Sequence, residues 1–316
     1  MMYFGEIISL VVAMLWTAAS LACEIASRRL GVVVLNVWRL LLALMFSMLM
    51  MWVVMDSPLP LYADTSAWIW LLISGVVGYA FGDWCLFNSY LAIGSRYGQL
   101  LMTLAPAFTA VAAWTMLGQQ MSLMSLLAMA VTMAGIAISV LGRGEGKRLS
   151  LGLPLRGVLF GIGAAMGQGI GLVLSKIGLD HYTASVPADV LPQVESYLPF
   201  GSNLIRCIAG LVCYTAWFFI ANGMKPRSER RSLATPLHDM RSMAAIIVAV
   251  VSGPFVGVSL SLMAVQYTGA GIASTLMATT PILILLPSRW LFNQPITLRS
   301  VVGAIVSVVG VALFFV

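Results

Sequence analysis

Residues 106–135 read PAFTAVAAWTMLGQQMSLMSLLAMAVTMAG, and residues 281–310 read PILILLPSRWLFNQPITLRSVVGAIVSVVG. The second stretch follows the first at a constant offset of 175 positions, and the alignment extends without a gap from Ser74–Leu141 to Ala249–Val316. Glycine, proline and polar residues keep the same register in both copies: Gly78 and Gly253, Gly82 and Gly257, Gly94 and Gly269, Pro106 and Pro281, Gln119 and Gln294, Ser125 and Ser300, Gly135 and Gly310. This register indicates a duplicated backbone rather than chance similarity among apolar residues.

The duplication predicts the fold class. Each copy reads as three hydrophobic helices, and the residues before each copy hold two more. A unit of five membrane-spanning helices crosses the bilayer an odd number of times, so its second copy enters the membrane upside down, as in many secondary transporters. We therefore expect an all-α polytopic membrane protein with ten transmembrane helices in two inverted five-helix repeats, at residues 1–142 and 154–316, joined by a basic linker at 143–153.

The composition excludes a soluble protein. The chain is 60% hydrophobic and 9% charged, with a mean hydropathy of +0.99. Apolar runs of about 20 residues are typical of membrane-spanning helices, and ten of them account for most of the 316 residues. The net charge of +6 therefore describes loops that face an anionic leaflet or the cytosol, and it does not indicate nucleic-acid binding.

The apolar runs place seven spans at residues 4–27, 32–55, 67–92, 96–117, 123–141, 154–177 and 200–221, and the repeat places three more after residue 241. The repeat extends weakly into the first two spans of each half, since Asn36-x-x-Arg39 in the second span matches Asn203-x-x-Arg206 in the seventh.

The basic residues predict the orientation. They lie in or beside the odd-numbered connections between spans, whereas the even-numbered connections and both tails hold no Lys or Arg. Cytoplasmic loops carry the excess of Lys and Arg, so we expect the odd connections inside and both termini outside. The residues concerned are Arg28, Arg29, Arg96, Arg143, Lys147, Arg148, Arg156, Lys225, Arg227, Arg230, Arg231, Arg241, Arg289 and Arg299.

The duplicated block resembles the drug/metabolite transporter superfamily, specifically its EamA-type members with ten helices. The shared pattern is a proline in helix 4, a polar turn and spaced glycines in helix 5: Pro106, Gly118-Gln119 and Gly135 in the first copy, and Pro281, Asn293-Gln294, Gly303 and Gly310 in the second. Leu15-Trp16 in helix 1 and Arg39 in helix 2 also look like the family. The resemblance covers essentially the whole chain. It implies a transporter of small solutes whose central cavity is lined by helices 1, 3, 4, 6, 8 and 9.

The sequence departs from the family pattern in two respects. The family's glutamate in the helix 4–5 turn is glutamine in both copies, Gln119 and Gln294, so any ion pair that this glutamate makes elsewhere is absent here. Family members of this length usually keep both termini in the cytoplasm, whereas the charges of this sequence predict the opposite orientation.

Three ionisable residues inside the predicted spans are candidates for solute or proton binding: Asp83, Glu24 and Lys176. An ionised side chain near the bilayer centre costs at least about 2.5–3.5 kcal/mol, so it must be paired, face water or be neutral. Asp83, whose counterpart in the second half is Val258, either binds a cation or proton or forms a structural pair with Lys176 or an arginine. Glu24 lies one turn from Arg28, and Lys176 lies near a helix end, so either can also reach the interface.

Uncharged polar residues on helices 1, 3, 6 and 8 complete the candidate binding site: Trp16, Tyr79, Asn88, Gln168, Gln266 and Tyr267. Trp and Tyr are also ordinary residues of the membrane interface, so each alone carries little weight. We expect structural roles for Arg39 and Arg206, which would anchor helix ends, and for Pro106 and Pro281, which would bend helices 4 and 9 and free backbone carbonyls.

No motif indicates an enzyme, a cofactor or a metal site. Residues 142–147 (GRGEGK) lack the spacing of a phosphate-binding loop and follow a helix where a strand is required. His181 and His238 are isolated, and the four cysteines lie in apolar segments without a CxxC pair. We therefore expect no enzymatic activity, no cofactor and no bound metal.

These features predict a secondary transporter, either an exporter or an exchanger, of a small organic solute such as an amino acid or related metabolite. Alternating access through a central cavity would move the solute, and the presence of both charge signs favours a zwitterion. Two alternatives remain open: a flippase for a lipid-linked head group, and a membrane scaffold or sensor that does not transport. The expected partners are the solute and the lipid bilayer, and a homodimer is compatible with the sequence. The expected location is a bacterial inner membrane.

Overall fold

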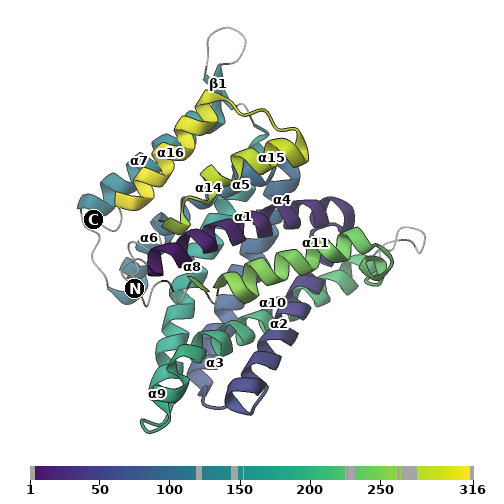
Figure 1. Cartoon of the computed structure of the whole chain (residues 1–316), viewed down its shortest axis with the longest axis vertical. Coiled ribbons are helices and arrows are strands. Elements are labelled where there is room, and N and C mark those ends of the chain that lie inside the picture. Colours follow the sequence, from purple (N-terminus) through teal and green to yellow (C-terminus); the bar gives the residue numbers. More distant parts are fainter. Residues whose placement is uncertain are drawn as a thin grey trace.

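The computed structural model describes residues 4–118, 123–143, 149–151, 153–224, 226, 232–258, 260–261, 264 and 276–313. These residues form mainly helices, with one two-stranded antiparallel ribbon of β1 (Leu141–Arg143) and β2 (Leu149–Leu151) (Figure 1). The all-α fold predicted from the sequence is therefore confirmed, and the ribbon is a small addition between the two repeats.

Seven helical stretches in the described residues are long and apolar enough to cross a membrane: Phe4–Leu30, Val32–Val53, Thr65–Ile93, Ser95–Leu117, Leu155–Ser185, Leu198–Gly223 and Met240–Val258. Three shorter apolar helices lie at the positions of the fifth, ninth and tenth predicted spans: Leu126–Ser139, Thr280–Phe292 and Leu298–Leu313. Together they account for the ten predicted spans. The sixth span continues to Ser185 instead of ending near residue 177, so the connection after it is shorter than the sequence suggested.

The first repeat begins with two continuous helices, α1 (Phe4–Leu30) and α2 (Val32–Met55). The third span consists of three consecutive segments, α3 (Thr65–Gly75), the π-helical η1 (Val76–Asp83) and α4 (Trp84–Ile93). The fourth span is divided into α5 (Ser95–Met102) and α6 (Ala105–Leu117), and the fifth is α7 (Leu123–Val140).

The second repeat begins with the long helix α8 (Leu155–Ser185). The short α9 (Leu191–Val194) and the 3-10 turn η2 (Glu195–Tyr197) lead into α10 (Leu198–Gly223). The 3-10 turn η4 (Thr235–His238) precedes α11 (Met240–Val250) and the π-helical η5 (Val251–Phe255). The last described helices are α14 (Thr280–Leu283), α15 (Leu285–Phe292) and α16 (Leu298–Leu313).

Irregular backbone occurs at matching places in the two halves. The π-helical segments η1 and η5 begin at Val76 and Val251, which the offset of 175 positions relates. The fourth and ninth spans break just before Pro106 and Pro281, and each proline lies in the first turn of the helix that follows. Proline is favoured there because it has no N–H to donate. The duplicated backbone therefore repeats its irregularities as well as its helices, and π-helical segments are frequent at functional sites.

Small residues let helices of the two repeats approach closely. The helices α7 and α16 pack against each other, and a Cβ atom added at Gly303 would lie 2.5 Å from the carbonyl oxygen of Gly135. A Cβ atom added at Gly167 on α8 would lie 2.7 Å from the Cα atom of Gly82 in η1. Glycine at such contacts is typical of helix packing in membranes.

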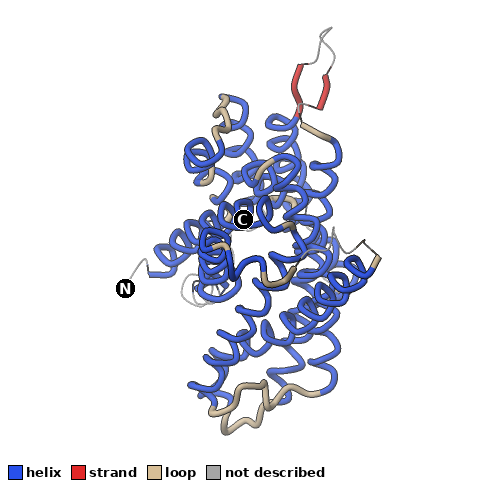
Figure 2. The backbone as a smooth tube through the Cα atoms, turned by 90° about the vertical axis from the view of Figure 1, so that its right-hand side faces the viewer, coloured by secondary structure: helices blue, strands red, loops and turns tan. Residues whose placement is uncertain are grey.

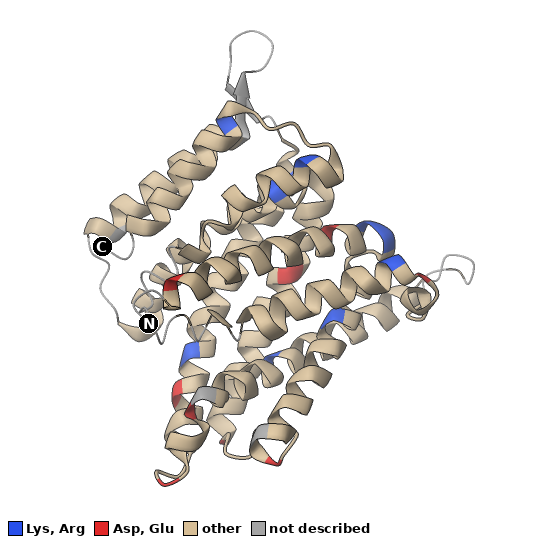
Figure 3. Cartoon of the chain, in the orientation of Figure 1, with Lys and Arg blue, Asp and Glu red and all other residues tan. Residues whose placement is uncertain are grey.

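The two sides of the molecule differ in charge. Figure 2 shows the β ribbon projecting beyond the helices at one end and loops at the opposite end. Figure 3 shows that Lys and Arg gather mainly toward the side with the ribbon and the turn between α1 and α2. Most Asp and Glu lie toward the opposite side, with α9 and both termini.

Candidate functional site

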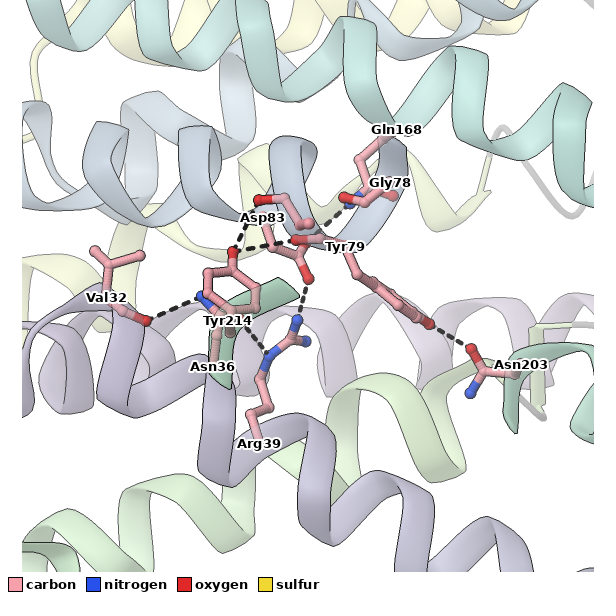
Figure 4. A network of polar contacts seen from close by, with 10 residues as sticks. Val32, Asn36, Arg39, Gly78, Tyr79, Asp83, Gln168, Asn203 and Tyr214 are labelled. Atoms are coloured by element: carbon pink, nitrogen blue, oxygen red, sulfur yellow. Dashed lines mark hydrogen bonds and ion pairs between the residues drawn. The ribbon is translucent and has the colours of Figure 1, made fainter. Parts of the chain in front are cut away.

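The candidate site is a buried cluster of polar side chains around Asp83 (Figure 4). Asp83 ends η1, and Arg39 on α2 forms an ion pair with its carboxylate; the two side chains are 5% and 8% exposed, respectively. Arg39 Nε also donates a hydrogen bond to Asn36 Oδ1 at 3.3 Å. Residues three apart share one face of a helix, so Asn36 helps to hold the guanidinium toward Asp83.

The second repeat contributes to the same carboxylate through Gln168. Gln168 lies on α8, and its Nε2 donates a hydrogen bond to Asp83 Oδ1 at 2.9 Å and to the Gly78 carbonyl at 3.3 Å. Arg39 bonds to the other oxygen, Oδ2. Each oxygen of Asp83 thus accepts a hydrogen bond, one from each repeat, and a buried carboxylate requires such partners. The cluster therefore joins the two halves.

Tyrosine hydroxyl groups bind the irregular backbone next to Asp83. Tyr214 on α10 donates to the carbonyl oxygens of Tyr79 and Ala80, both at 3.1 Å. Tyr79 lies within η1 and donates to Asn203 Oδ1 on α10, and Asn203 Nδ2 donates to the Pro254 carbonyl in η5 at 3.3 Å. One chain of hydrogen bonds thus connects the π-helical segments of the two repeats.

Arg206 on α10 is the second arginine of the cluster. Its guanidinium lies over the Tyr79 ring, with the central carbon 4.8 Å from the ring centroid. Its Nε atom is buried and has no hydrogen-bond partner among the described residues. A Cβ atom at Gly78 would come within 3.0 Å of Arg206 Nη2, so glycine leaves the room in which the guanidinium lies. Arg206 thus belongs to the polar cluster, whereas the sequence suggested an anchor for a helix end.

Glu24 lies in a different polar group. Its carboxylate is buried and accepts from Arg28 at 3.0 and 2.7 Å on Oε1. Its other oxygen, Oε2, accepts from the backbone N–H of Ser95 at 2.6 Å. Ser95 is the first residue of α5, where backbone N–H groups lack partners within the helix. Glu24 therefore ties the start of α5 to the end of α1, and the predicted contact with Arg28 is present.

A contact between the repeats lies next to Glu24. Arg96 Nη1 donates to the Pro295 carbonyl at 2.8 Å. The side chain of Gln294 packs against Gly94, which has a φ of 84°. Positive φ favours glycine, and a Cβ atom here would also collide with Gln294 Nε2. The turn between the third and fourth spans is therefore packed on the connection between the ninth and tenth. Gln119 lies outside the described residues.

The remaining predicted residues do not join the Asp83 cluster among the described contacts. Lys176 pairs with Asp180 on its own helix at 2.9 Å, and both side chains are more than half exposed. Asn88 donates to the Trp84 carbonyl of its own helix at 2.7 Å. Trp16 lies against Gly257, where an added Cβ atom would be 2.9 Å from its ring nitrogen. Gln266 and Tyr267 lie outside the described residues.

Sequence reasoning missed Tyr214 and did not assign a binding role to Asn36 or Asn203. The available signal was a polar residue within an apolar span, and the N-x-x-R pattern of both repeats pointed to two of the three. In the described part of the chain, no group of three or more His, Cys, Asp or Glu residues lies close enough together to hold a metal ion.

A third polar group lies where the first span ends and the eighth begins. Asp239, the N-cap residue of α11, pairs with Arg29 at 2.9 Å and also accepts from the Ser242 hydroxyl. The hydrogen bond from Arg29, and then the one from Ser242, hold the pKa of Asp239 below its usual range. This carboxylate stays ionised at neutral pH and fastens the end of α1 to the start of α11.

Comparisons with known proteins agree with this architecture. The profile of the EamA-like transporter family matches residues 3–141 and 155–316. A solved structure described as "Crystal structure of protein" is similar over 98% of this chain and 95% of its own, with a TM-score of 0.59 and 13% sequence identity. At that identity the similarity shows a shared fold alone. No curated protein matches the sequence.

Proposed function

The chain belongs to the EamA-like transporter family, and from this premise we propose that it is a secondary transporter of a small organic solute. Members of this family are membrane transporters of small solutes, and this protein is an integral membrane protein with many apolar spans. The proposal adds the mechanism, the class of solute and the site. The solute is an amino acid or a related metabolite, and the protein exports or exchanges it by alternating access.

One observation carries the proposal: the buried ion pair of Arg39 and Asp83, which Gln168 links to the second repeat. Ionisable groups inside a membrane are costly, and they mark solute or proton pathways by default. In alternating access, one repeat rocks against the other around a fixed site near the middle of the bilayer. A carboxylate that binds side chains of both repeats changes its contacts when one repeat moves against the other.

In this proposal, Asp83 couples solute transport to the movement of protons. A proton taken up by its carboxylate removes the negative charge that Arg39 faces, while the guanidinium stays charged. The ion pair then weakens, and the contact between η1 and α2 loosens. Release of the proton restores the pair. If the protein instead exchanges solutes without net proton movement, Asp83 stays ionised and the ion pair with Arg39 is a fixed structural element.

The irregular backbone supplies the moving parts. Helices 3, 4, 8 and 9 are four of the six that the family resemblance assigns to the cavity, and these four carry the π-helical segments or the breaks before Pro106 and Pro281. Backbone of this kind at membrane depth is tolerated where it is buried in protein or lines a cavity. Changes in φ and ψ at these points would let each repeat bend without unfolding a whole helix.

We also propose that both termini face outward, in a bacterial inner membrane, with the repeats divided at residues 142 and 154. The distribution of basic residues supports this orientation (Figure 3). A cysteine introduced at Thr235, in a variant without the native cysteines, should resist a maleimide that does not cross membranes. A cysteine at Asp189 should react in intact cells. The reverse pattern contradicts the orientation and leaves transport untouched.

Counterflow tests the proposed function. Liposomes with purified protein are preloaded with a pooled metabolite extract, and uptake of labelled amino acids, nucleosides and organic acids is measured. The measurement is made at about pH 6 and about pH 8, so that any dependence on protons is detected. Uptake of one class above that of protein-free liposomes supports a transporter and identifies the solute class. The absence of exchange by folded protein contradicts the proposal and favours a lipid flippase or a non-transporting scaffold.

A further inference from the structure

The polar cluster around Asp83 carries surplus positive charge. Arg39 and Arg206 each contribute one positive charge, and a guanidinium does not lose its proton in proteins. Asp83 is the one carboxylate that the described contacts place in the cluster. The net charge is positive when Asp83 is ionised, and it is more positive when Asp83 is protonated. The cluster is therefore positive in either protonation state of Asp83.

Of the two arginines in this cluster, Arg206 has no counter-charge among the described residues. Among the described residues it takes part in no ion pair, and its buried Nε has no hydrogen-bond partner. Both oxygens of Asp83 already accept from Arg39 and Gln168. The Arg206 guanidinium lies over the face of the Tyr79 ring, and such a contact does not use its N–H groups.

The repeat explains why the partner is missing. Arg39 and Arg206 occupy matching places in the N-x-x-R pattern of the two halves. Arg39 pairs with Asp83, but the position that corresponds to Asp83 in the second half is Val258. The first repeat thus contains a complete pair of arginine and carboxylate. The second repeat keeps the arginine and lacks the carboxylate.

We propose that the missing carboxylate is supplied by the solute: Arg206 binds an oxyanion of the transported molecule, a carboxylate or a phosphate. A planar guanidinium binds both groups through two parallel hydrogen bonds. An anion would neutralise the surplus charge of the cluster, and the attraction between opposite charges is strongest where water is excluded. This inference rests on the proposed transport function and adds one chemical requirement: the solute carries a carboxylate or a phosphate.

The first test is competition in counterflow. Proteoliposomes preloaded with a mixture of amino acids or of hexose phosphates take up the labelled solute. For the amino-acid pool, the competitors are the amino acids and their amides. For the hexose-phosphate pool, the competitors are the hexose phosphates and the free hexoses. We expect the form without the oxyanion to compete roughly tenfold less well or worse, because charge-assisted hydrogen bonds contribute about 1.5–3 kcal/mol. Equal competition by the amide or the free hexose overturns the inference and leaves the transport function intact. The two preloaded pools distinguish a carboxylate from a phosphate.

The variants Arg206→Gln and Arg206→Lys test the residue. We expect Arg206→Gln to raise the half-saturating concentration roughly tenfold or more, and Arg206→Lys, which keeps the charge, to raise it less. Arg156→Gln is the matched control, because Arg156 is exposed at the start of α8. An unchanged half-saturating concentration in Arg206→Gln overturns the inference.

Thermal unfolding of the purified protein tests anion binding without transport. Sodium benzoate or sodium phosphate should raise the Tm of the parent and of Arg156→Gln more than sodium chloride at equal ionic strength, since a ligand that binds only the folded state stabilises it. Arg206→Lys should show a smaller rise, and Arg206→Gln none. A rise equal to that of chloride in every protein overturns the inference. A rise without counterflow keeps the anion site and contradicts the transport function.

Discussion

Arg39 and Asp83 form an ion pair between the second and third spans, and both side chains are almost fully buried. Gln168 from the second repeat binds the same carboxylate. Asp83 therefore makes one contact within the first repeat and one contact between the repeats. In the proposed mechanism, the solute, the proton and the movement of the two halves all act on this ion pair.

Removal of one partner from this ion pair should destabilise the protein more than removal of both. Arg39→Gln and Asp83→Asn each leave an uncompensated buried group, and loss of one partner of a buried pair costs about 3–5 kcal/mol. The double variant leaves two neutral amides and should recover a large part of that loss. Unfolding in detergent, measured for all four proteins of the cycle, gives the coupling. Additive losses would contradict the ion pair.

Glu24 should matter for stability and not for the choice of solute. Glu24→Ala leaves the Ser95 N–H group and the Arg28 guanidinium without their shared partner, and an unsatisfied buried group costs about 1–3 kcal/mol. Lys176→Ala is the matched control, because the exposed pair with Asp180 should contribute about 0–1 kcal/mol. Equal unfolding midpoints for the two variants would show that the Glu24 contacts carry no stability.

The contact between α7 and α16 should depend on the absence of side chains. Gly303→Val adds three carbon atoms where a single Cβ atom already comes within 2.5 Å of the Gly135 carbonyl, so the helices must separate. Overpacking of this kind typically costs about 1–3 kcal/mol. Val302→Leu changes the preceding residue, which is 40% exposed, and should leave Tm unchanged. Similar Tm values for the two variants would contradict the close packing.

The contribution of Asp239 to stability should persist in mild acid. Its pKa in the folded protein is lowered by Arg29 and Ser242, so the stabilisation is complete above the ordinary aspartate pKa of about 4 and is lost as pH falls below it. The Tm difference between the parent and Asp239→Asn should therefore be constant from about pH 8 to about pH 5. The difference should shrink as the pH falls below about 4, and a difference that does not change there would show that the pKa is not lowered.

The sequence predicted the ten spans and the duplication because glycine, proline and hydrophobicity are read directly from the residues. It also identified Asp83, Tyr79 and Gln168, which lie in apolar spans where polar side chains are conspicuous. It did not predict the π-helical segments, since no residue type specifies them and Pro254 is present only in η5. Nor did it predict that Arg206 points into the cluster, because snorkelling to a helix end is equally compatible with a single arginine.

The choice between partners was also beyond sequence reasoning. Asp83 had several candidate cations, and the structure selects Arg39, whereas Lys176 lies with Asp180 at the surface. Spacing along one helix predicts contacts such as that of Glu24 with Arg28. Contacts between helices depend on their rotation and depth, which residues far apart in sequence decide together.

Counterflow by Asp83 variants shows whether transport requires the buried carboxylate. The parent, Asp83→Glu, Asp83→Asn and the double variant Arg39→Gln/Asp83→Asn are reconstituted at equal amounts, after each is shown to be folded, and uptake of the solute found for the parent is measured. We predict uptake by the parent and by Asp83→Glu, which keeps a carboxylate, and none by Asp83→Asn or the folded double variant. Full uptake by either protein without the carboxylate would show that transport does not depend on Asp83.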